Sequence, residues 1–492
     1  MYGFTRRLVL AGLPLLFSPP SSFASIYYLS PQGSDVSTAG LSESTPWRTF
    51  RYAFSLMSPG DELVLLDGQY SDAAGTGYIS SDSCAGCGQP PSGIGPDQET
   101  VVRAKTPGNV TITGRLTLGT KSTSGKEQYV RIQGITFEGG GSLYNTFHVT
   151  ISGCGFHATD NGSGNVFSIG TIEHDYHNTY DLIEDCWIWG RDRLIAINYR
   201  SDFNVWRRVV LRGDGCNSSS CQGGGNPNVG LSVYNSSGVS LQNVLVLDRM
   251  LDSGQPYGDF ATAQHAPSPA VDEGADEYLG PNEWLGCISL NSEDTGYYFE
   301  ADNANPNTHR LINVIAWNNG GLGLNIGKNA SSVDLENITL GNSHGGDNLR
   351  VAPEVQGGTV RNIIAYKAGR YGVNSSAAPS YSDVSGAAAG NYNQTSCSAS
   401  CLTTDPLTAS PPPLKYILRI EDGSSLKGTG YGGADYGANV VKRYGNEGSR
   451  YGDSGYNALT AQDLWPWPIR IESAAKCAGA PRGDSAARPG LL

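Results

Sequence analysis

The sequence predicts an all-β protein, a single-stranded right-handed parallel β-helix. The first observation is a recurring pattern of the form apolar-x-Asn-apolar-x-apolar. Its clearest copies are 241–246, 311–316, 335–340 and 360–365, with looser copies at 132–137, 151–156, 183–188 and 206–211. The closest copies lie about 24 residues apart, a spacing found in solenoid proteins. Such repeats stack on one another because a single unit cannot bury its own apolar face.

A second pattern, apolar-x-apolar-Asn/Tyr, falls between copies of the first. Its copies are 195–198, 231–234, 288–291 and 322–325. Each repeat therefore carries at least two strands with alternating side chains. The Asn of the first pattern lies where the chain must bend, and Asn tolerates left-handed backbone angles. A β-sandwich with chance spacing is the alternative, but two patterns that keep their order over about 250 residues favour the β-helix.

The composition limits the function classes. The chain has 492 residues, 65 of them Gly, only 16% charged residues and a net charge of -13. A turn-rich secreted β protein fits these values, whereas binding to nucleic acid or to an anionic membrane surface does not. An acidic substrate would need a local basic patch or a bound cation.

The N-terminus has the features of a secretory signal in residues 1–24. Arg6 and Arg7 precede an apolar run, and Ser22-Phe23-Ala24 supplies small residues at the cleavage position. The run is too short to span a bilayer, so we expect no membrane insertion, and we expect a secreted protein, extracellular or periplasmic. The pair of arginines also resembles a twin-arginine export signal.

All ten cysteines follow this signal, an even number that suits an oxidising compartment. Three pairs are close enough in sequence for local disulfides: Cys84/Cys87, Cys216/Cys221 and Cys397/Cys401. Cys154 and Cys186 occupy the same position of successive copies of the first pattern, so they stack as buried thiols or form a bridge. We favour a disulfide over a metal site at Cys84-Ala-Gly-Cys87, because the sequence has no second CxxC.

Residues 25–100 form the expected N-terminal cap and opening segment. Ile26–Asp35 is followed by Pro46-Trp47-Arg48-Thr49-Phe50, a short amphipathic stretch to Met57, and the apolar run to Leu66. This opening resembles that of secreted bacterial β-helix proteins, including polysaccharide lyases. The resemblance implies a short helix that covers the open end of the first coil, which would otherwise expose an edge.

We expect the β-helix itself over residues 101–395, and a C-terminal connector and irregular Gly/Tyr-rich cap or tail over 396–492. The tail resembles the C-terminal segment of other secreted bacterial β-helix repeat proteins. We interpret it as a wrap along the flank of the solenoid. Trp465 and Trp467 would then pack in place, since the prolines beside them rigidify the segment. Stacking of these two rings on a sugar is the alternative.

Three long insertions interrupt the repeat, at 213–228, 248–286 and 291–307. We expect them to cluster, because they belong to neighbouring coils, and clustered loops on a rigid scaffold often bind or catalyse. Alternation predicts that the strand residues beside them form an outward column of amides and a phenol that bond to sugar hydroxyls: Asn198, Tyr234, Asn291 and Asn325. An Asn ladder that only stabilises a turn is the alternative.

Arginines gather just upstream of the insertions. Arg193, Arg200 and Arg212 are candidate catalytic residues, and Arg208 a candidate substrate-binding residue, because a guanidinium matches a uronic carboxylate. His174 and His177 are candidate proton carriers in the preceding coil, and Asp248 is a candidate catalytic carboxylate. Pairing of the arginines with nearby aspartates is the alternative. The second insertion is acidic and could bind calcium through its carboxylate oxygens, and the sequence indicates no other cofactor.

These features predict a secreted carbohydrate-active protein that binds an acidic polysaccharide along the β-helix face, acting as a polysaccharide lyase or epimerase. Both reactions need a base and a positive group that stabilises the enolate. No complete catalytic signature of either family is present, and fold alone does not define function. The alternatives are a non-catalytic glycan-binding surface protein or adhesin, and a glycoside hydrolase that uses Asp248, Asp214 and Glu293. A monomer is the expected state.

Overall fold

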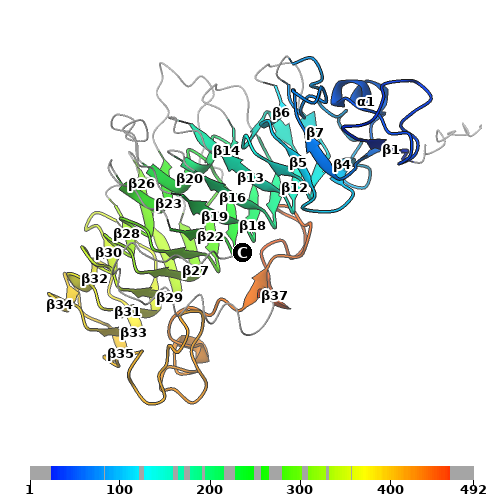
Figure 1. Ribbon diagram of the computed structural model, residues 1–492. Coiled ribbons are helices and arrows are strands. Elements are labelled where there is room, and N and C mark those ends of the chain that lie inside the picture. The colour runs from blue at the N-terminus through cyan, green and yellow to red at the C-terminus, as the bar shows by residue number, and fades with distance from the viewer. Residues whose placement is uncertain are drawn as a thin grey trace, which may run out of the picture.

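The computed structural model shows a long stack of coils, with the N-terminal helix at one end (Figure 1). It describes residues 24–81, 84–120, 127–158, 164–170, 178–190, 194–214, 228–248, 256–264, 280–301, 308–327, 332–355 and 357–465. Each coil in the middle of the stack contributes two strands to one large sheet and one strand to a second sheet. The chain is a right-handed parallel β-helix, as the sequence predicts.

Two sheets make up the solenoid. The strands of the large sheet are β1 (Ile26–Leu29), β2 (Glu62–Leu65), β3 (Gly68–Tyr70), β4 (Thr100–Ala104), β5 (Val110–Ile112), β8 (Val130–Gln133), β9 (Thr136–Phe137), β12 (Thr150–Ser152), β13 (Gly155–Ala158), β15 (Leu182–Glu184), β16 (Trp187–Gly190), β18 (Val205–Arg207), β19 (Val210–Gly213), β21 (Ser240–Gln242), β22 (Leu245–Leu247), β24 (Glu283–Leu285), β25 (Ile288–Leu290), β27 (His309–Trp317), β29 (Val333–Gly341), β31 (Val360–Tyr366), β33 (Ser380–Ser385) and β35 (Ala399–Leu402). The eleven-stranded sheet contains β6 (Leu116–Gly119), β10 (Gly141–Tyr144), β14 (Asn165–Ile169), β17 (Leu194–Tyr199), β20 (Asn228–Tyr234), β23 (Pro256–Gln264), β26 (Tyr297–Ala301), β28 (Leu324–Ile326), β30 (Leu349–Val351), β32 (Tyr371–Ser375) and β34 (Gly390–Asn393).

The remaining elements are short. They are helix α1 (Phe50–Leu56), the parallel pair β7 (Glu127–Gln128) and β11 (Thr146–Phe147), the 3-10 turn Tyr431–Gly433, and the antiparallel pair β36 (Lys442–Tyr444) and β37 (Leu459–Asp463). The parallel pairing of the solenoid already begins where β1 meets β2, and it ends where β33 meets β35. The solenoid therefore extends beyond 101–395 at both ends.

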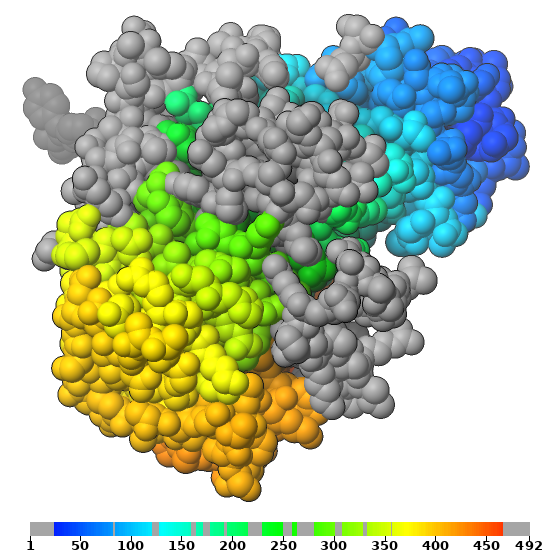
Figure 2. Space-filling model, turned by 60° about the vertical axis from the view of Figure 1, so that its left-hand side comes forward, coloured from blue at the N-terminus to red at the C-terminus, as the bar shows by residue number. Residues whose placement is uncertain are grey.

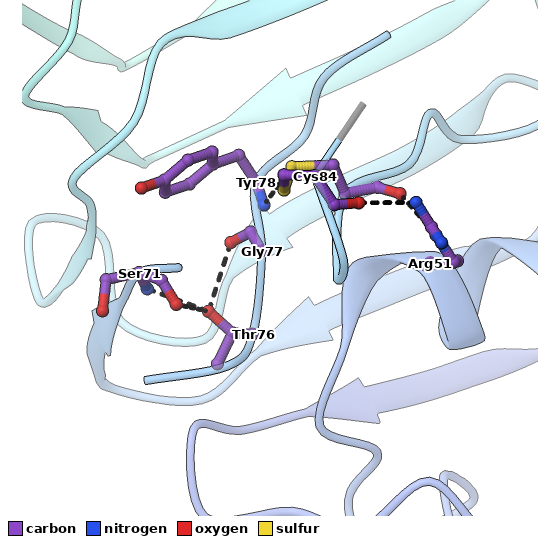
Figure 3. The surroundings of a disulfide bond; sticks show 7 residues. Arg51, Ser71, Thr76, Gly77, Tyr78 and Cys84 are labelled. Carbon is purple, nitrogen blue, oxygen red and sulfur yellow. Dashed lines mark hydrogen bonds between the residues drawn. A yellow bond between two sulfur atoms is a disulfide. The ribbon is translucent and has the colours of Figure 1, made fainter. Parts of the chain in front are cut away.

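Helix α1 covers the first coil, as the resemblance implies. Thr49 caps the helix by accepting a hydrogen bond from the backbone N–H of Tyr52, and Phe50 and Ala53 are fully buried beneath it. The predicted Cys84–Cys87 disulfide lies beside the helix, where the Arg51 guanidinium donates to the carbonyl oxygens of both cysteines (Figure 3). The disulfide thus fixes the loop against the cap.

Each coil bends between its two strands of the large sheet at one residue with a left-handed backbone. In the middle and late coils these residues are Asp185, Arg208, Asn243, Gly286, Asn313, Asn337 and Asn362, with φ between 51° and 66°. Most of them are Asn or Gly, which accept this conformation at low cost. This confirms the role predicted for the Asn of the first pattern. Two of these Asn side chains also bond to one another between coils, from Asn362 Nδ2 to Asn337 Oδ1 at 2.9 Å.

The C-terminal segment 414–465, which we call the strap, returns along the outside of the large sheet (Figure 1, orange). Its apolar side chains form a separate cluster with outward residues of the late coils, among them Ile315, Trp317 and Tyr366. Trp465 joins the edge of this cluster and donates from Nε1 to the carbonyl of Val440 at 3.0 Å. The tail therefore wraps along the flank, and Trp465 packs rather than facing solvent. Trp467 lies outside the described residues.

The bend residues hold the strap in place. The side-chain oxygens of Asn243, Asn313 and Asn362 each accept a hydrogen bond from a strap backbone N–H, at 2.7, 3.1 and 2.7 Å. Further along, the buried Arg207 donates to the strap carbonyls of Asn446, Ser449 and Tyr456. The same Asn side chains that allow the coil to bend therefore also bind the strap.

The cysteines divide into two classes. The Cys397–Cys401 disulfide forms as predicted, whereas Cys216 and Cys221 lie outside the described residues. Cys154 and Cys186 are buried thiols rather than a bridge, and Cys287 is a third. All three occupy the position after the bend residue, where their side chains point into the core.

Candidate functional site

Part of the outer face of the large sheet carries large side chains that the strap leaves exposed. Trp187 and Trp189 project outward from β16, on either side of the inward-facing Ile188, and Trp187 is 54% exposed. The ring of His157, from the neighbouring β13, stacks on Trp189 with centroids 5.0 Å apart and planes 13° apart. We call Trp187, Trp189 and His157 the aromatic shelf.

Small side chains make room for this shelf. Gly155 pairs with Trp187 across β13 and β16, and a Cβ at Gly155 would lie 3.3 Å from the ring of Trp189. The indole of Trp189 therefore rests over backbone rather than over a side chain. Glu138 flanks the shelf in the preceding coil, where its Oε2 lies 3.3 Å from Nδ1 of His157.

Arg212 lies next to the shelf, because β16 and β19 pair with Trp189 opposite Arg212. As predicted, its side chain points outward beside the first insertion, and it is 40% exposed. Its Nε atom lies between two carboxylates, 3.9 Å from Asp214 and 3.8 Å from Asp248. Both distances exceed that of a direct hydrogen bond, so the guanidinium keeps donors for a ligand.

The neighbouring arginines differ from Arg212. Arg208 donates directly to both carboxylate oxygens of Asp185, at 2.6 and 2.8 Å, and its side chain is only 7% exposed. Arg207 is fully buried and bonds to Glu184 and to the strap. Both side chains therefore stabilise the fold by pairing with acidic residues, in line with the alternative that the sequence left open, and substrate binding by Arg208 stays an untested prediction.

Asp248 begins a hydrogen-bonded ladder along the corner that follows the second strand of each coil. Its Oδ1 accepts from Nδ2 of Asn291 at 2.9 Å, and Oδ1 of Asn291 accepts from Nδ2 of Asn318 at 2.7 Å. Nε2 of His344 lies 2.8 Å from Oδ1 of Asn318. These four residues, which we call the corner ladder, extend the site from Arg212 toward the late coils.

Two of the predicted sugar-binding amides, Asn198 and Asn291, lie elsewhere than the sequence predicts. Asn198 is fully buried, donates to the carbonyl of Ser201 and accepts from Nε1 of Trp206. The prediction that it points outward is wrong, because Asn198 pairs with Val233, whose side chain lies in the central core. The alternation breaks within β17, because the side chains of the consecutive residues Ile195 and Ala196 both lie in the central core.

Asn291 belongs to the corner ladder and not to the predicted column. Residues 288–290 form β25 of the large sheet, so Ile288 and Leu290 face outward under the strap, and Ser289 faces inward. The true strands of the eleven-stranded sheet in these coils are β23 and β26. The second and third insertions therefore contain regular strands, and the alternation of 288–291 could not reveal which sheet it joins.

Tyr234 and Asn325 do project from the outer face of the eleven-stranded sheet. Tyr234 lies beside Tyr199, with ring centroids 5.1 Å apart, and the guanidinium of Arg200 lies 5.2 Å from the Tyr199 ring. Asn325 pairs with Tyr298 on one side and Arg350 on the other, but it is almost completely buried. These residues lie on a different sheet from Arg212.

Several candidate residues lie outside the described part of the chain, namely Arg193, His174, His177 and most acidic residues of the second insertion. Asp259 of that insertion is described, and it points inward to accept from the hydroxyl of Ser289 at 2.7 Å. Within the described residues, no group of three His, Cys, Asp or Glu side chains could hold a metal ion. No helix among them has the length and apolar composition needed to cross a membrane.

The aromatic shelf is the part of the site that sequence reasoning missed. Trp187 and Trp189 follow the inward Cys186 and Ile188 in one of the looser pattern copies, so strict alternation places both rings outside. Two large apolar side chains on the outside of a strand are unusual for a solvent-facing surface. That signal was sufficient to find the shelf.

Comparison with known proteins gives similarities of shape at low identity. No protein-family model matches the chain, and no curated protein matches its sequence. Among solved structures, the pectate lyase Pel9A has a TM-score of 0.47 and 13% identity, covering 85% of this chain and 96% of its own. XylC in complex with xylose has a TM-score of 0.49 and 7% identity, over 77% and 86%. A rhamnogalacturonan lyase has a TM-score of 0.40 and 14% identity, over 70% and 82%.

Proposed function

We propose that this protein is a secreted carbohydrate-active protein that binds a polysaccharide along the outer face of its large sheet. The observation that carries the proposal is the aromatic shelf, in which Trp187 is 54% exposed beside the stacked Trp189 and His157. An exposed indole presents a flat apolar surface, which suits the C–H face of a sugar ring. The carboxylates and amides next to it can bond to sugar hydroxyls.

The shelf is more than an incidental apolar patch, because polar groups converge on it. Arg212 stands opposite Trp189 across the strand pair, and Asp214 and Asp248 flank the guanidinium. Ligand sites in proteins combine apolar surface with a few well-placed polar groups in this way. The strap covers the equivalent face of the later coils, so the exposed surface beside the shelf ends where the strap begins to cover the large sheet.

The test is the affinity of the protein, from Ser25 onward, for alginate, pectate, chondroitin sulfate and a neutral glucan, measured by affinity electrophoresis and by tryptophan fluorescence. The Trp187→Ala variant should lose about tenfold or more in affinity, as is typical when an aromatic anchor is removed. The matched control is Ile94→Ala, which removes another exposed apolar side chain, 61% exposed, from the N-terminal region. Unchanged binding by Trp187→Ala would refute the proposed site.

The reaction that Arg212 favours is proton removal next to a uronic carboxylate, as in a lyase or an epimerase. Its two acidic neighbours stay at 3.8–3.9 Å, so the guanidinium can turn to a substrate carboxylate and support the enolate charge. His174 and His177 remain the proposed proton carriers. Elimination would produce unsaturated uronate, which absorbs ultraviolet light.

A rise in absorbance that is lost in Arg212→Gln and kept in Arg310→Gln would support elimination. Arg310 is a fair control because it is similarly exposed and lies 3.6 Å from Glu283. Retention of a glycan without any product would favour the non-catalytic binding protein instead. Cleavage of the glycan without a rise in ultraviolet absorbance would favour hydrolysis. Asp214 and Asp248, the carboxylates beside Arg212, would then be the candidate catalytic groups.

We also propose export through the N-terminal signal. The Cys84–Cys87 and Cys397–Cys401 disulfides support an oxidising compartment. N-terminal sequencing of the exported protein should begin at Ser25, and retention in the cytosol would contradict the proposal.

A further inference from the structure

Three basic side chains in the late coils lack the acidic partners that most others have. Arg103, Arg131, Arg361 and Lys442, for example, each form an ion pair of 2.5 to 2.7 Å. Arg350, Lys367 and Arg370 are exposed, and within the described residues no carboxylate lies within ion-pair distance of them. They occur within two successive coils of a chain whose net charge is -13.

Two of these cations lie against aromatic rings. The Lys367 ammonium lies 4.9 Å from the centre of the Tyr366 ring, and the Arg370 guanidinium lies 5.8 Å from that of Tyr371. Contact with an aromatic face stabilises a cation without cancelling its charge for other ligands.

Two nearby carboxylates are already satisfied by other donors. Asp347 accepts from the N–H of Tyr371 and from Nδ2 of Asn374. Asp405 accepts from the N–H groups of Leu407 and Thr408 and from the Tyr366 hydroxyl. The basic side chains therefore keep their charge available for a ligand. We call Lys367 and Arg370 the basic edge, whereas Arg350 lies on β30 of the eleven-stranded sheet and not at the corner. In Figure 2 the yellow-green and yellow coils that carry it form part of the surface facing the viewer.

The basic edge continues the line that begins at Arg212. Lys367 occupies the same left-handed corner position as Asp248, Asn291, Asn318 and Asn342 in the preceding coils. Each of these four residues donates its backbone N–H to a carbonyl of the next coil, which places them one above another. Five coil steps separate the coil of Arg212 from that of Lys367, or about 24 Å at the spacing of paired strands.

We infer that a linear anionic polysaccharide lies along this corner, parallel to the solenoid axis, with its acidic groups held by Arg212 at one end and by the basic edge at the other. The inference rests on the proposed function and specifies the substrate class and its direction of binding. The rise of one coil is similar to the length of one sugar in an extended chain, so successive sugars can meet successive coils. His344, the exposed end of the corner ladder, then faces sugar hydroxyls between the two charged ends.

The small number of cations favours a sparsely charged glycan over a nucleic acid. A nucleic acid carries a phosphate charge at every nucleotide, so a protein that binds it needs many basic contacts. This chain is instead strongly acidic overall. Lys and Arg with intervening amides suit a polymer in which carboxylates alternate with hydroxyl-rich surface.

The experiment measures the affinity of oligogalacturonates of about three to eight sugars for the wild-type protein and for Lys367→Gln/Arg370→Gln. The wild-type affinity should rise with length up to about six sugars, the number of coils in the line. The variant should bind the longest oligomer at least about tenfold more weakly and the shortest one, which the aromatic shelf holds, unchanged. The control is Arg103→Gln/Lys105→Gln, which removes the same charge from paired side chains in the first coils.

The fully methyl-esterified octamer, which has no charge, should not distinguish the variant from the wild type. Equal binding of the charged octamer by Lys367→Gln/Arg370→Gln and wild type would overturn the inference, and the proposed function would stand if Trp187→Ala still weakened binding. If neither variant alters binding, both proposals are wrong.

Discussion

Arg207 is the residue on which the attachment of the strap depends most. Its side chain is fully buried and forms six hydrogen bonds at 2.7–3.2 Å: one to Gln242, one to Glu184, and four to the strap at Asn446, Ser449 and Tyr456. Burial lowers the pKa of this guanidinium, and the bond to Glu184 opposes that effect. The perturbation is Arg207→Leu, which keeps an apolar stem and removes all six donor contacts.

The expected cost follows from what the substitution leaves behind. Glu184 would stay buried, with Arg208 Nη2 at 2.9 Å and the N–H of Gly448 as its remaining partners. Removing one partner of a buried pair costs about 3–5 kcal/mol when the other charge is left unpaired, and because Arg208 still pairs with Glu184 we expect a cost near the lower end of that range. Because solenoid stability is approximately a sum of neighbouring contacts, this loss should appear first as local release of the strap.

Amide hydrogen exchange measures that release. The backbone N–H groups of Asn439 and Tyr444, which bond to Asn313 and Asn243, should exchange about a hundredfold faster or more in Arg207→Leu. Arg103→Leu is the control, since it breaks a partly exposed pair with Glu62 worth about 1 kcal/mol or less. Exchange in Arg207→Leu no faster than in Arg103→Leu would refute the reasoning.

Two further predictions concern the coils themselves. Asn243 combines a left-handed backbone (φ 51°) with bonds to Tyr444 and Lys442, so Asn243→Ala should destabilise the protein by about 2–3 kcal/mol and Asn243→Gly by less, and thermal melting will test this order. Burial lowers the pKa of His309 to about 4 from 6.5, and its Nδ1 accepts from the N–H of Asn282. The neutral ring is thus favoured in the fold. Stability from this group should be complete above about pH 6.5 and fall by at most about 3 kcal/mol as the pH drops toward 4, an acid loss that His309→Gln should lack in denaturant titrations.

The fold could be predicted because each coil needs a left-handed bend, and the residues that allow this bend recur in the sequence. Asn243, Asn313, Asn337 and Asn362 recur where the backbone must be left-handed, and few other residues take that conformation easily. The binding of Asn243, Asn313 and Asn362 to the strap could not be predicted, since their partners Tyr444, Asn439 and Tyr431 lie 201, 126 and 69 residues away along the chain.

The site was harder to predict because alternation gives the face of a residue but not its sheet. The sequence of 288–291 has the same pattern as 195–198 and 231–234, yet residues 288–290 form β25 in the large sheet. Likewise, the charge pattern around Arg207, Arg208 and Arg212 could not show which arginine remains exposed. That difference depends on whether Glu184 or Asp185 lies within reach.

The most direct test of glycan binding at the aromatic shelf is hydroxyl-radical footprinting with and without an octagalacturonate, read by mass spectrometry. Trp187 is highly exposed and should react readily in the free protein. We expect the oligosaccharide to protect Trp187, Trp189 and His157 and to leave Tyr199 and Tyr234 unchanged. Protection of the two tyrosines of the eleven-stranded sheet, with Trp187 still reactive, would contradict it.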